Sequence, residues 1–191
     1  APFNVKGFSA GNTGVQMGGW FKKPINSVGD LKGLKIRMPG LGGDVLRELG
    51  STVVNIPGGE LFQALSQKTI DALEWVGPYN DRAFGFQKAA KMYYWPGWHE
   101  PCANLECLVN KKSYEKLPKD LQAIIATACD AANLKMYAEF TSRNARALED
   151  LVKRDKVQVK KFPDSVLKKL AETSNAVVAN TAAKSKLTKK V

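Results

Sequence analysis

Residues 34–40 read LKIRMPG, a short apolar strand pattern that ends at a Pro-Gly pair. The pattern returns twice, as TVVNIPGG at 52–59 and as ALEWVGP at 72–78. The helical patterns that follow these strands cover residues 44–49, 60–67 and about 81–90. Strands that alternate with helices are typical of βαβ units. The sequence therefore predicts an α/β fold with a parallel or mixed sheet.

The rest of the chain also divides into extended and helical segments. Residues 1–19 form an extended, Gly-rich start, residues 27–30 a loop or a short helix, and 91–100 a dense aromatic cluster. The remaining predictions are a strand over 104–110, a long helix over about 118–154, a strand over 157–162, an amphipathic helix from about 165 and a frayed end over 184–191.

The composition is that of an ordinary folded protein. Of the 191 residues, 44% are hydrophobic and 25% are charged, which excludes a wholly disordered chain. No apolar run approaches the ~18 residues that a membrane-spanning helix needs. The chain opens without an initiator Met or a charged-then-apolar leader, and we expect any signal peptide to have been removed already.

The formal net charge of +11 raises the question of an anionic partner. Residues 160–191 carry eight Lys against Asp164 and Glu172, a net of +6, which leaves +5 for residues 1–159. A solvated, Lys-rich helix face explains this most simply. The alternative is a nucleic-acid-binding domain that uses this Lys-rich C-terminal segment, but no helix-turn-helix, zinc-finger or RNP pattern accompanies it. We therefore expect no nucleic-acid partner.

The chain has three cysteines, Cys102, Cys107 and Cys129. With a single His in the chain, their spacing makes no zinc site. An extended stretch from 102 to 107 would point those two side chains to opposite faces, which disfavours a local disulfide. We interpret all three as small buried thiols.

Two charged residues stand where predicted strands end. Arg37 lies two residues before the first Pro-Gly pair, and Glu74 lies three residues before Gly77-Pro78. Ligands of open α/β sheets bind just beyond the carboxyl ends of the strands. There an Arg can hold a carboxylate bidentately, and a Glu can accept a hydroxyl or bind a hard cation. The alternative is an Arg37–Glu74 ion pair that braces neighbouring strands.

An enzymatic interpretation rests on His99 and Glu100, which could form an acid/base pair. Adjacent residues of an extended segment point to opposite sides, however, and no nucleophile motif accompanies them. The glycines of 40–43 lack the Lys-Ser/Thr of a phosphate-binding loop. A small-acid enzyme therefore stays an alternative, and we expect a protein that binds a small anion without turning it over.

Several segments together resemble the solute-binding proteins of TRAP transporters, the DctP-like family. They are WFKKPI at 20–25, DLKGLKIRMPG at 30–40, IDALEW at 70–75 and GPYND at 77–81. The segments GWHEP at 97–101, NKK at 110–112 and LP at 117–118 resemble the subgroup that binds 2-oxo acids or lactate with a cation. The resemblance covers about residues 1–180.

The resemblance implies a two-lobed, periplasmic-binding-protein-like fold. Because family members are longer, it further implies that residues 1–191 are a C-terminal part, mainly one lobe plus part of the other. Within it we expect a βα-alternating ligand-binding lobe and crossover over about 20–110, a long connecting helix over about 118–155 and a C-terminal helix over about 163–183.

The resemblance also implies a site. Arg37 matches the residue that pairs with the ligand carboxylate. The residues implied to contact the substrate are Gln16, Arg37, Trp75, Tyr79, Asn80 and His99. Those implied to surround a Na⁺ or Ca²⁺ ion are Gln16, Glu74, Trp75 through its carbonyl, and Glu100. A hard cation turns the repulsion between protein carboxylates and an organic anion into attraction.

The function implied is that of a periplasmic receptor, exported by a signal peptide absent from this chain. It would bind a small 2-oxo or 2-hydroxy monocarboxylate, pyruvate- or lactate-like, with the cation and no organic cofactor. The implied partners are the TRAP membrane permease subunits and, through the C-terminal helix, a second copy of the chain.

Overall fold

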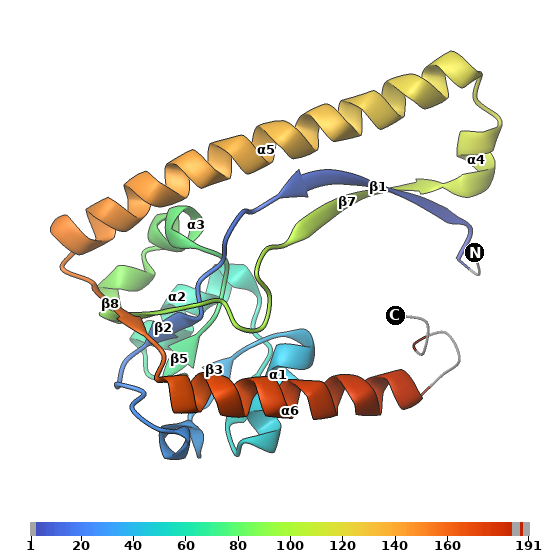
Figure 1. Ribbon diagram of the computed structural model, residues 1–191. Coiled ribbons are helices and arrows are strands. Elements are labelled where there is room, and N and C mark those ends of the chain that lie inside the picture. Colours follow the sequence, from blue (N-terminus) through green and yellow to red (C-terminus); the bar gives the residue numbers. More distant parts are fainter. Residues whose placement is uncertain (1–2, 185–187, 189–191) are drawn as a thin grey trace.

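The centre of the molecule is a mixed six-stranded sheet. The structure, a computed structural model, describes residues 3–184 and 188 (Figure 1). The spatial order is β4 (Thr52–Val54), β3 (Lys35–Arg37), β5 (Ala72–Leu73), β2 (Gly19–Phe21), β6 (Met92–Trp95) and β8 (Gln158–Lys161). Strand β3 lies between β4 and β5 and runs parallel to both. Strand β2 pairs antiparallel with β5 and β6, and β6 runs parallel to β8. The predicted α/β fold with a mixed sheet is confirmed.

The helices of the repeat differ in detail from the sequence pattern. Helix α1 (Gly40–Glu48) begins four residues before the predicted 44, and α2 (Leu61–Ser66) follows a 3₁₀ turn, η2 (Gly58–Glu60). The predicted helix over 81–90 is wrong, because α3 (Pro78–Ala83) stops early and η3 (Phe86–Lys88) is a separate 3₁₀ turn. Between them Gly85 has φ +81°, a left-handed conformation that ends a helix.

Three strands come from segments that were predicted without a defined strand. The aromatic cluster over 91–100 contains β6, the extended start over 1–19 contains β1 (Val5–Asn12), and β2 begins at Gly19, where that start ends. Strand β6 buries Tyr93 on one face of the sheet and Tyr94 on the other. Because both faces are apolar, the strand lacks the alternation that marks a half-buried strand in a sequence.

A second, two-stranded ladder is formed by β1 and β7 (Asn104–Asn110), which run antiparallel. The long helix α5 (Lys119–Lys153) lies along this ladder and continues over α3, as Figure 1 shows. Gly11 permits the close approach, because a Cβ there would lie 2.6 Å from the Met136 sulfur. The short helix α4 (Lys111–Glu115) links β7 to α5. The long helix predicted over about 118–154 is therefore confirmed.

Two apolar clusters lie on opposite faces of the six-stranded sheet. Successive residues of a strand alternate between them, so Phe21 faces one cluster and Trp20 the other. Helices α1 and α6 (Asp164–Ala183) cover the first face, and α2 with the end of α5 covers the second. The predicted strand over 157–162 and the helix from about 165 are confirmed as β8 and α6.

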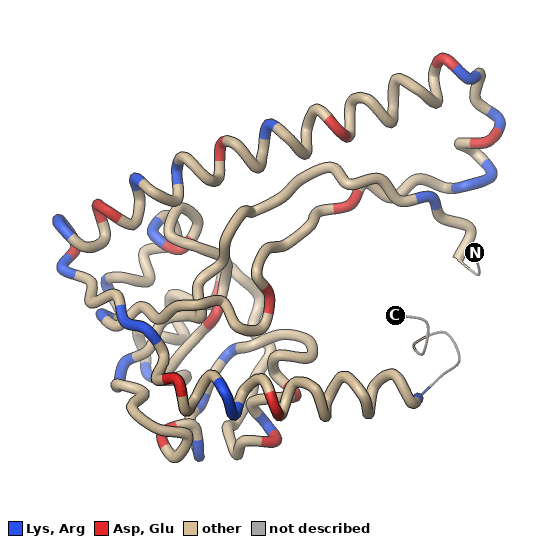
Figure 2. Tube along the Cα trace, viewed as in Figure 1, with Lys and Arg blue, Asp and Glu red and all other residues tan. Residues whose placement is uncertain are grey.

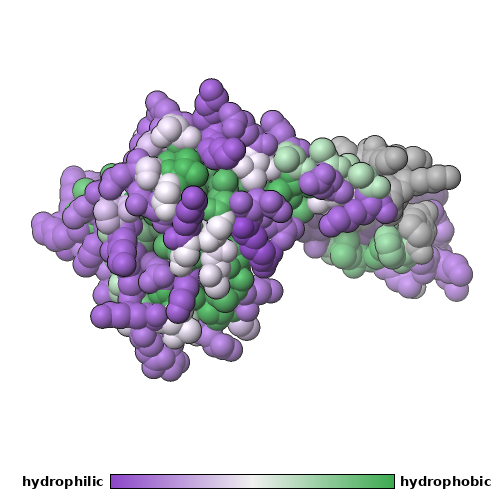
Figure 3. All heavy atoms as spheres, turned by 90° about the horizontal axis from the view of Figure 1, so that it is seen from below, coloured by the Kyte–Doolittle hydropathy of each residue, from purple (hydrophilic) through white to green (hydrophobic). Residues whose placement is uncertain are grey.

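The charged residues are spread over the surface with both signs interspersed (Figure 2). On α6, Lys168 and Lys169 are exposed, and Lys169 lies 3.7 Å from Glu172. Seen from below, hydrophilic residues dominate the face around the sheet (Figure 3). Both lysines of α6 are therefore solvated, as predicted, whereas Lys186, Lys189 and Lys190 of the predicted Lys-rich segment lie outside the described residues. Most of the predicted frayed end, 184–191, lies outside the described residues.

The three cysteines are free thiols, but only Cys129 is fully buried, whereas Cys102 and Cys107 are half-buried. The prediction of three buried thiols is thus wrong for two of them. In the described part of the chain, no helix has the length and apolar character needed to cross a lipid bilayer.

The packing of α6 on the sheet predicts that substitutions on its buried and exposed sides change the free energy of unfolding differently. Leu170 is 2% exposed in the first cluster, whereas Val178 on the same helix is 53% exposed. Leu170→Ala is expected to lower the free energy of unfolding by roughly 2–5 kcal/mol through lost burial and a cavity. Val178→Ala should change it by about 0.5 kcal/mol or less. Urea unfolding followed by circular dichroism measures both, and equal effects would contradict this packing.

Candidate functional site

The site is built on the parallel pairing of β3 with β5. Arg37 is the last residue of β3 and lies in register with Leu73, the last residue of β5, so Glu74 follows at the same sheet edge. The Glu74 amide donates to the Arg37 carbonyl at 3.1 Å. This arrangement places both side chains beyond the carboxyl ends of parallel strands, where α/β sheets bind ligands.

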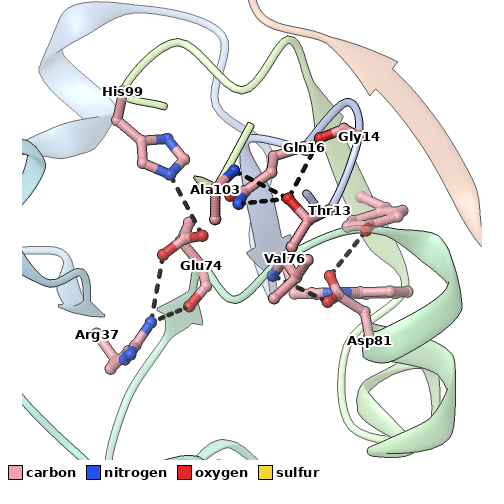
Figure 4. Close-up of polar contacts among 11 residues, drawn as sticks. Thr13, Gly14, Gln16, Arg37, Glu74, Val76, Asp81, His99 and Ala103 are labelled. Carbon is pink, nitrogen blue, oxygen red and sulfur yellow. Dashed lines mark hydrogen bonds and ion pairs between the residues drawn. The ribbon is translucent and has the colours of Figure 1, made fainter. Parts of the chain in front are cut away.

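Arg37 and Glu74 form a buried ion pair (Figure 4). Arg37 Nη1 donates to the Glu74 carbonyl at 2.6 Å and to Glu74 Oε2 at 3.2 Å, and the two side chains are 9% and 3% exposed. Burial lowers the pKa of Arg37, and the Glu74 charge opposes that shift. The ion pair weighed from the sequence is therefore present, but it does not satisfy the guanidinium, because the buried Arg37 Nε has no hydrogen-bond partner among the described residues.

His99 completes a row of three polar side chains with Arg37 and Glu74 (Figure 4). Its Nε2 lies 3.3 Å from Glu74 Oε1, within ion-pair distance but without hydrogen-bond geometry, and neither ring nitrogen has a hydrogen-bond partner. The neighbouring Glu100 is exposed and makes none of these contacts. The acid/base pair of the enzymatic alternative is thus not formed, since His99 faces Glu74 instead.

Gln16 lies in the segment that connects β1 to β2 and is 2% exposed. Its Nε2 donates to Thr13 Oγ1 at 3.3 Å, and its backbone amide donates to the Pro101 carbonyl at 3.1 Å. The Gln16 Oε1 atom is buried and has no donor. A buried amide oxygen without a donor is available to a ligand or a cation.

Thr13 accepts the hydrogen bond from the Gln16 side chain and was not among the site residues predicted from the sequence. Its hydroxyl accepts from the Ala103 amide at 2.9 Å and donates to the Gly14 carbonyl at 3.3 Å. This threonine therefore ties the connection between β1 and β2 to the connection between β6 and β7. A threonine in a Gly-rich stretch gave no sequence signal that it would be buried.

Trp75 follows Glu74 and packs between a cation and an aromatic ring. The Arg37 guanidinium carbon lies 5.0 Å from the centre of the Trp75 indole. The centres of the Trp75 and Phe84 rings are 5.3 Å apart. A Cβ on Gly58 would lie 2.7 Å from the indole, so only glycine fits there. The indole Nε1 is buried without a hydrogen-bond partner. Trp75 thus belongs to the same site as Arg37 and Glu74.

Tyr79 and Asn80 are not brought together with Arg37. Both lie on α3, and the Tyr79 ring packs edge-on against Phe140 of α5 at 5.5 Å. Its hydroxyl accepts a hydrogen bond from Arg143 Nη1 at 2.8 Å, and the two line a surface hollow of about 400 Å³ between α3 and α5. A role of these two residues in substrate binding stays a prediction.

Asp81 is a buried carboxylate next to the site, 1% exposed. It accepts hydrogen bonds from Trp20 Nε1 at 2.9 Å, from the Tyr93 hydroxyl at 2.7 Å and from the Val76 amide at 3.1 Å (Figure 4). Burial raises its pKa to about 7, against the lowering effect of the three hydrogen bonds. Burial and the Asp81 charge likewise raise the pKa of Tyr93.

The donors at the site fit a hard cation. Glu74 offers a buried carboxylate and Gln16 an amide oxygen without a partner, and their segments adjoin, because the Met17 amide donates to the Val76 carbonyl at 3.1 Å. Both are the oxygen ligands that Na⁺ and Ca²⁺ prefer. Over residues 3–184 and 188, no three His, Cys, Asp or Glu side chains are grouped to hold a metal ion, so a cation here needs carbonyl and ligand oxygens as well.

Comparison with known proteins places the chain in a family. The family model of bacterial extracellular solute-binding proteins, family 7 (DctP), matches residues 3–185. The chain therefore belongs to this family, as its motifs indicated. Because this is a family of solute-binding proteins, the prediction that the chain is not an enzyme is confirmed.

A curated relative is the monocarboxylate 2-oxoacid-binding periplasmic protein all3028 of Nostoc sp., 54% identical over 152 residues. A TRAP periplasmic solute-binding protein of Colwellia psychrerythraea, solved with calcium and pyruvate, is 47% identical with a TM-score of 0.93. One from Pseudoalteromonas atlantica T6c, solved with sodium and pyruvate, is 46% identical with a TM-score of 0.90.

The chain spans about half the length of these relatives. The match to the Nostoc protein covers 80% of the chain and 42% of that protein. The matches to the two structures cover 99% of the chain and 58% and 57% of theirs. The predicted α/β fold with its long helix is thus confirmed, because it matches part of each of these solved TRAP solute-binding proteins.

The buried Asp81 predicts a pH dependence of stability. Because its folded-state pKa is raised from 3.8 to about 7, the folded protein holds a proton that the unfolded chain has lost. The contribution of Asp81 to stability therefore falls as pH rises from about 4 through 7. Relative to Asp81→Asn, the free energy of unfolding of the wild type should fall by up to roughly 4 kcal/mol across this range.

Urea unfolding of both proteins from pH 5 to 8 measures this difference. A wild-type curve parallel to that of Asp81→Asn would show that Asp81 does not titrate in this range.

Proposed function

We propose that the protein containing this chain is a periplasmic receptor of a TRAP transporter. It binds a small 2-oxo or 2-hydroxy monocarboxylate together with Na⁺ or Ca²⁺ and delivers the acid to the membrane permease. The observation that carries the proposal is the buried Arg37–Glu74 pair at adjacent strand ends, beside unpartnered polar atoms of Arg37 and Gln16.

Arg37 supplies the carboxylate-binding group in this proposal. Its guanidinium is held in place by the Glu74 carbonyl and the face of Trp75, so little side-chain freedom is left to lose on binding. Only Nη1 is engaged by Glu74, which leaves N–H groups for a bidentate bond to a carboxylate. Two relatives solved with pyruvate support an acid of this size.

Glu74 and Gln16 supply oxygen atoms for the cation, with the Trp75 carbonyl and Glu100 as further proposed ligands. A bound cation would neutralise the repulsion between the Glu74 carboxylate and an organic anion held by Arg37. Glu100 is exposed, so its participation requires that the segment 97–101 turn toward Gln16. A Cβ added to Gly97 would lie 2.8 Å from the Gln16 carbonyl oxygen and 3.1 Å from that of Glu100. The segment 97–101 is therefore already adjacent to Gln16.

We further propose that residues 1–191 are the C-terminal part of the receptor. About 20–110 would form the ligand-binding lobe, 118–155 the connecting helix and 163–183 the C-terminal helix. The part of the relatives that this chain does not match would then supply the opposite wall of the cleft. Closure of both walls removes water from the ligand and strengthens each charged contact.

Ligand-dependent stabilisation tests the function. Melting temperatures would be measured for the 191-residue chain and for a chimera that adds the unmatched part of the Nostoc relative. Pyruvate, lactate and longer 2-oxo acids would be compared, each with Na⁺, Ca²⁺ or neither. A ligand at ~100 times its Kd stabilises by ~2.7 kcal/mol, so we expect a clear, cation-dependent shift in the chimera. No shift with any acid would contradict the proposal.

The role of Arg37 is tested by Arg37→Ala in the same chimera. Loss of the guanidinium leaves the ligand carboxylate buried without its partner, so affinity should fall by roughly 2–5 kcal/mol. Arg47→Ala is the matched control, because Arg47 is half exposed on α1 and forms its ion pair with Asp44 of the same helix. Titration calorimetry with pyruvate measures both, and an unchanged affinity of Arg37→Ala would exclude Arg37 as the carboxylate ligand.

A further inference from the structure

The Asp81 side chain accepts hydrogen bonds from two strands of the sheet and from the turn before α3. Its two carboxylate oxygens face different parts of the molecule. Oδ2 accepts from Trp20 of β2 and Tyr93 of β6, whose rings stack at 4.0 Å and 16°. Oδ1 accepts from the amide of Val76 in the turn between β5 and α3. The carboxylate thus joins a rigid part of the sheet to that turn.

The turn held by Asp81 is the one that carries Glu74 and Trp75. Val76 is fixed from both sides, because its amide donates to Asp81 and its carbonyl accepts from the Met17 amide at 3.1 Å. Met17 directly follows Gln16. The chain of contacts from Asp81 through Val76 to Met17 therefore sets where Glu74 and Trp75 lie relative to Gln16.

We propose that Asp81 is a positioning residue for cation and carboxylate binding, which it serves by holding the Val76 amide and so the spacing between Glu74, Trp75 and Gln16. This inference rests on the proposed function. Asp81 touches neither ligand, and its effect passes through the backbone. Residues that orient metal ligands in this way commonly change metal affinity by about 10–100-fold when they are replaced.

The chemistry of the three donors explains why a carboxylate stands here. Trp20 Nε1, the Tyr93 hydroxyl and the Val76 amide all donate, so their partner must accept on both oxygens. An asparagine can accept on one side only. In Asp81→Asn, the amide oxygen can stay with Trp20 and Tyr93, whereas the NH₂ group then faces the Val76 N–H and that bond is lost.

The variant pair Asp81→Asn and Tyr93→Phe separates positioning from stability. Tyr93→Phe removes a buried hydrogen bond from the same carboxylate but leaves the bond to Val76 intact. Amide hydrogen exchange on the 191-residue chain is the first measurement. Exchange at Val76 and its neighbours should accelerate in Asp81→Asn and stay near the wild-type rate in Tyr93→Phe, after correction for global stability.

Affinity is the second measurement, with Ca²⁺ and pyruvate as the probes in the chimera. Calcium affinity should fall about tenfold or more in Asp81→Asn and stay within about threefold of wild type in Tyr93→Phe. Equal affinities in both variants, or unchanged exchange at Val76, would overturn the positioning role while leaving the receptor function intact. Failure of the wild type itself to bind calcium and pyruvate would overturn the function and this inference together.

Discussion

The parallel pairing of β3 with β5 is the constraint on which the site depends. It places Arg37 and Glu74 at one sheet edge, where both lose water and must find partners within the protein. A buried pair of this kind contributes little net stability, because the cost of desolvation offsets the attraction. Its value lies in geometry: the Glu74 carbonyl and carboxylate fix one nitrogen of the guanidinium, and Trp75 fixes its plane. Under the proposed function, the same interaction would serve both as the ion pair that braces two strands and as the preorganised holder of an anion.

The other polar groups reach this edge from the two connections between the sheet and the β1–β7 ladder. Gln16 lies on the first connection and His99 on the second, and the two are joined by the bonds of Thr13 and Gln16 to Ala103 and Pro101. Under the proposed function, a ligand held by both the strand ends and these connections would join the sheet to the ladder through its own contacts.

The sequence predicted what depends on local pattern and missed what depends on long-range packing. The βα repeat and the long helix were predictable because Pro, Gly and the apolar period mark their ends, and Arg37 with Glu74 followed from strand ends and family motifs. Strand β6 was missed because Tyr93 and Tyr94 are buried on opposite faces and leave no alternation. The contacts of Tyr79 with Phe140 and Arg143 of α5 could not be predicted, because those residues lie far along the chain, and its role in substrate binding stays a prediction. Asp81 lies in the GPYND motif, but its burial could not be predicted, since nothing local distinguishes a buried acid at the start of a short helix from a solvated one.

Under the proposed function, charge balance ties the number of ligand carboxylates to the charge of the cation. Arg37 and Glu74 neutralise each other, so the buried pair leaves no net charge to offset an arriving anion. With Na⁺ a monocarboxylate preserves that neutrality, whereas a dicarboxylate with Na⁺ would bury an uncompensated negative charge at substantial cost. With Ca²⁺ one positive charge is left over, and the carboxylate of Glu100, on the segment beside Gln16, is the nearest proposed source of compensation.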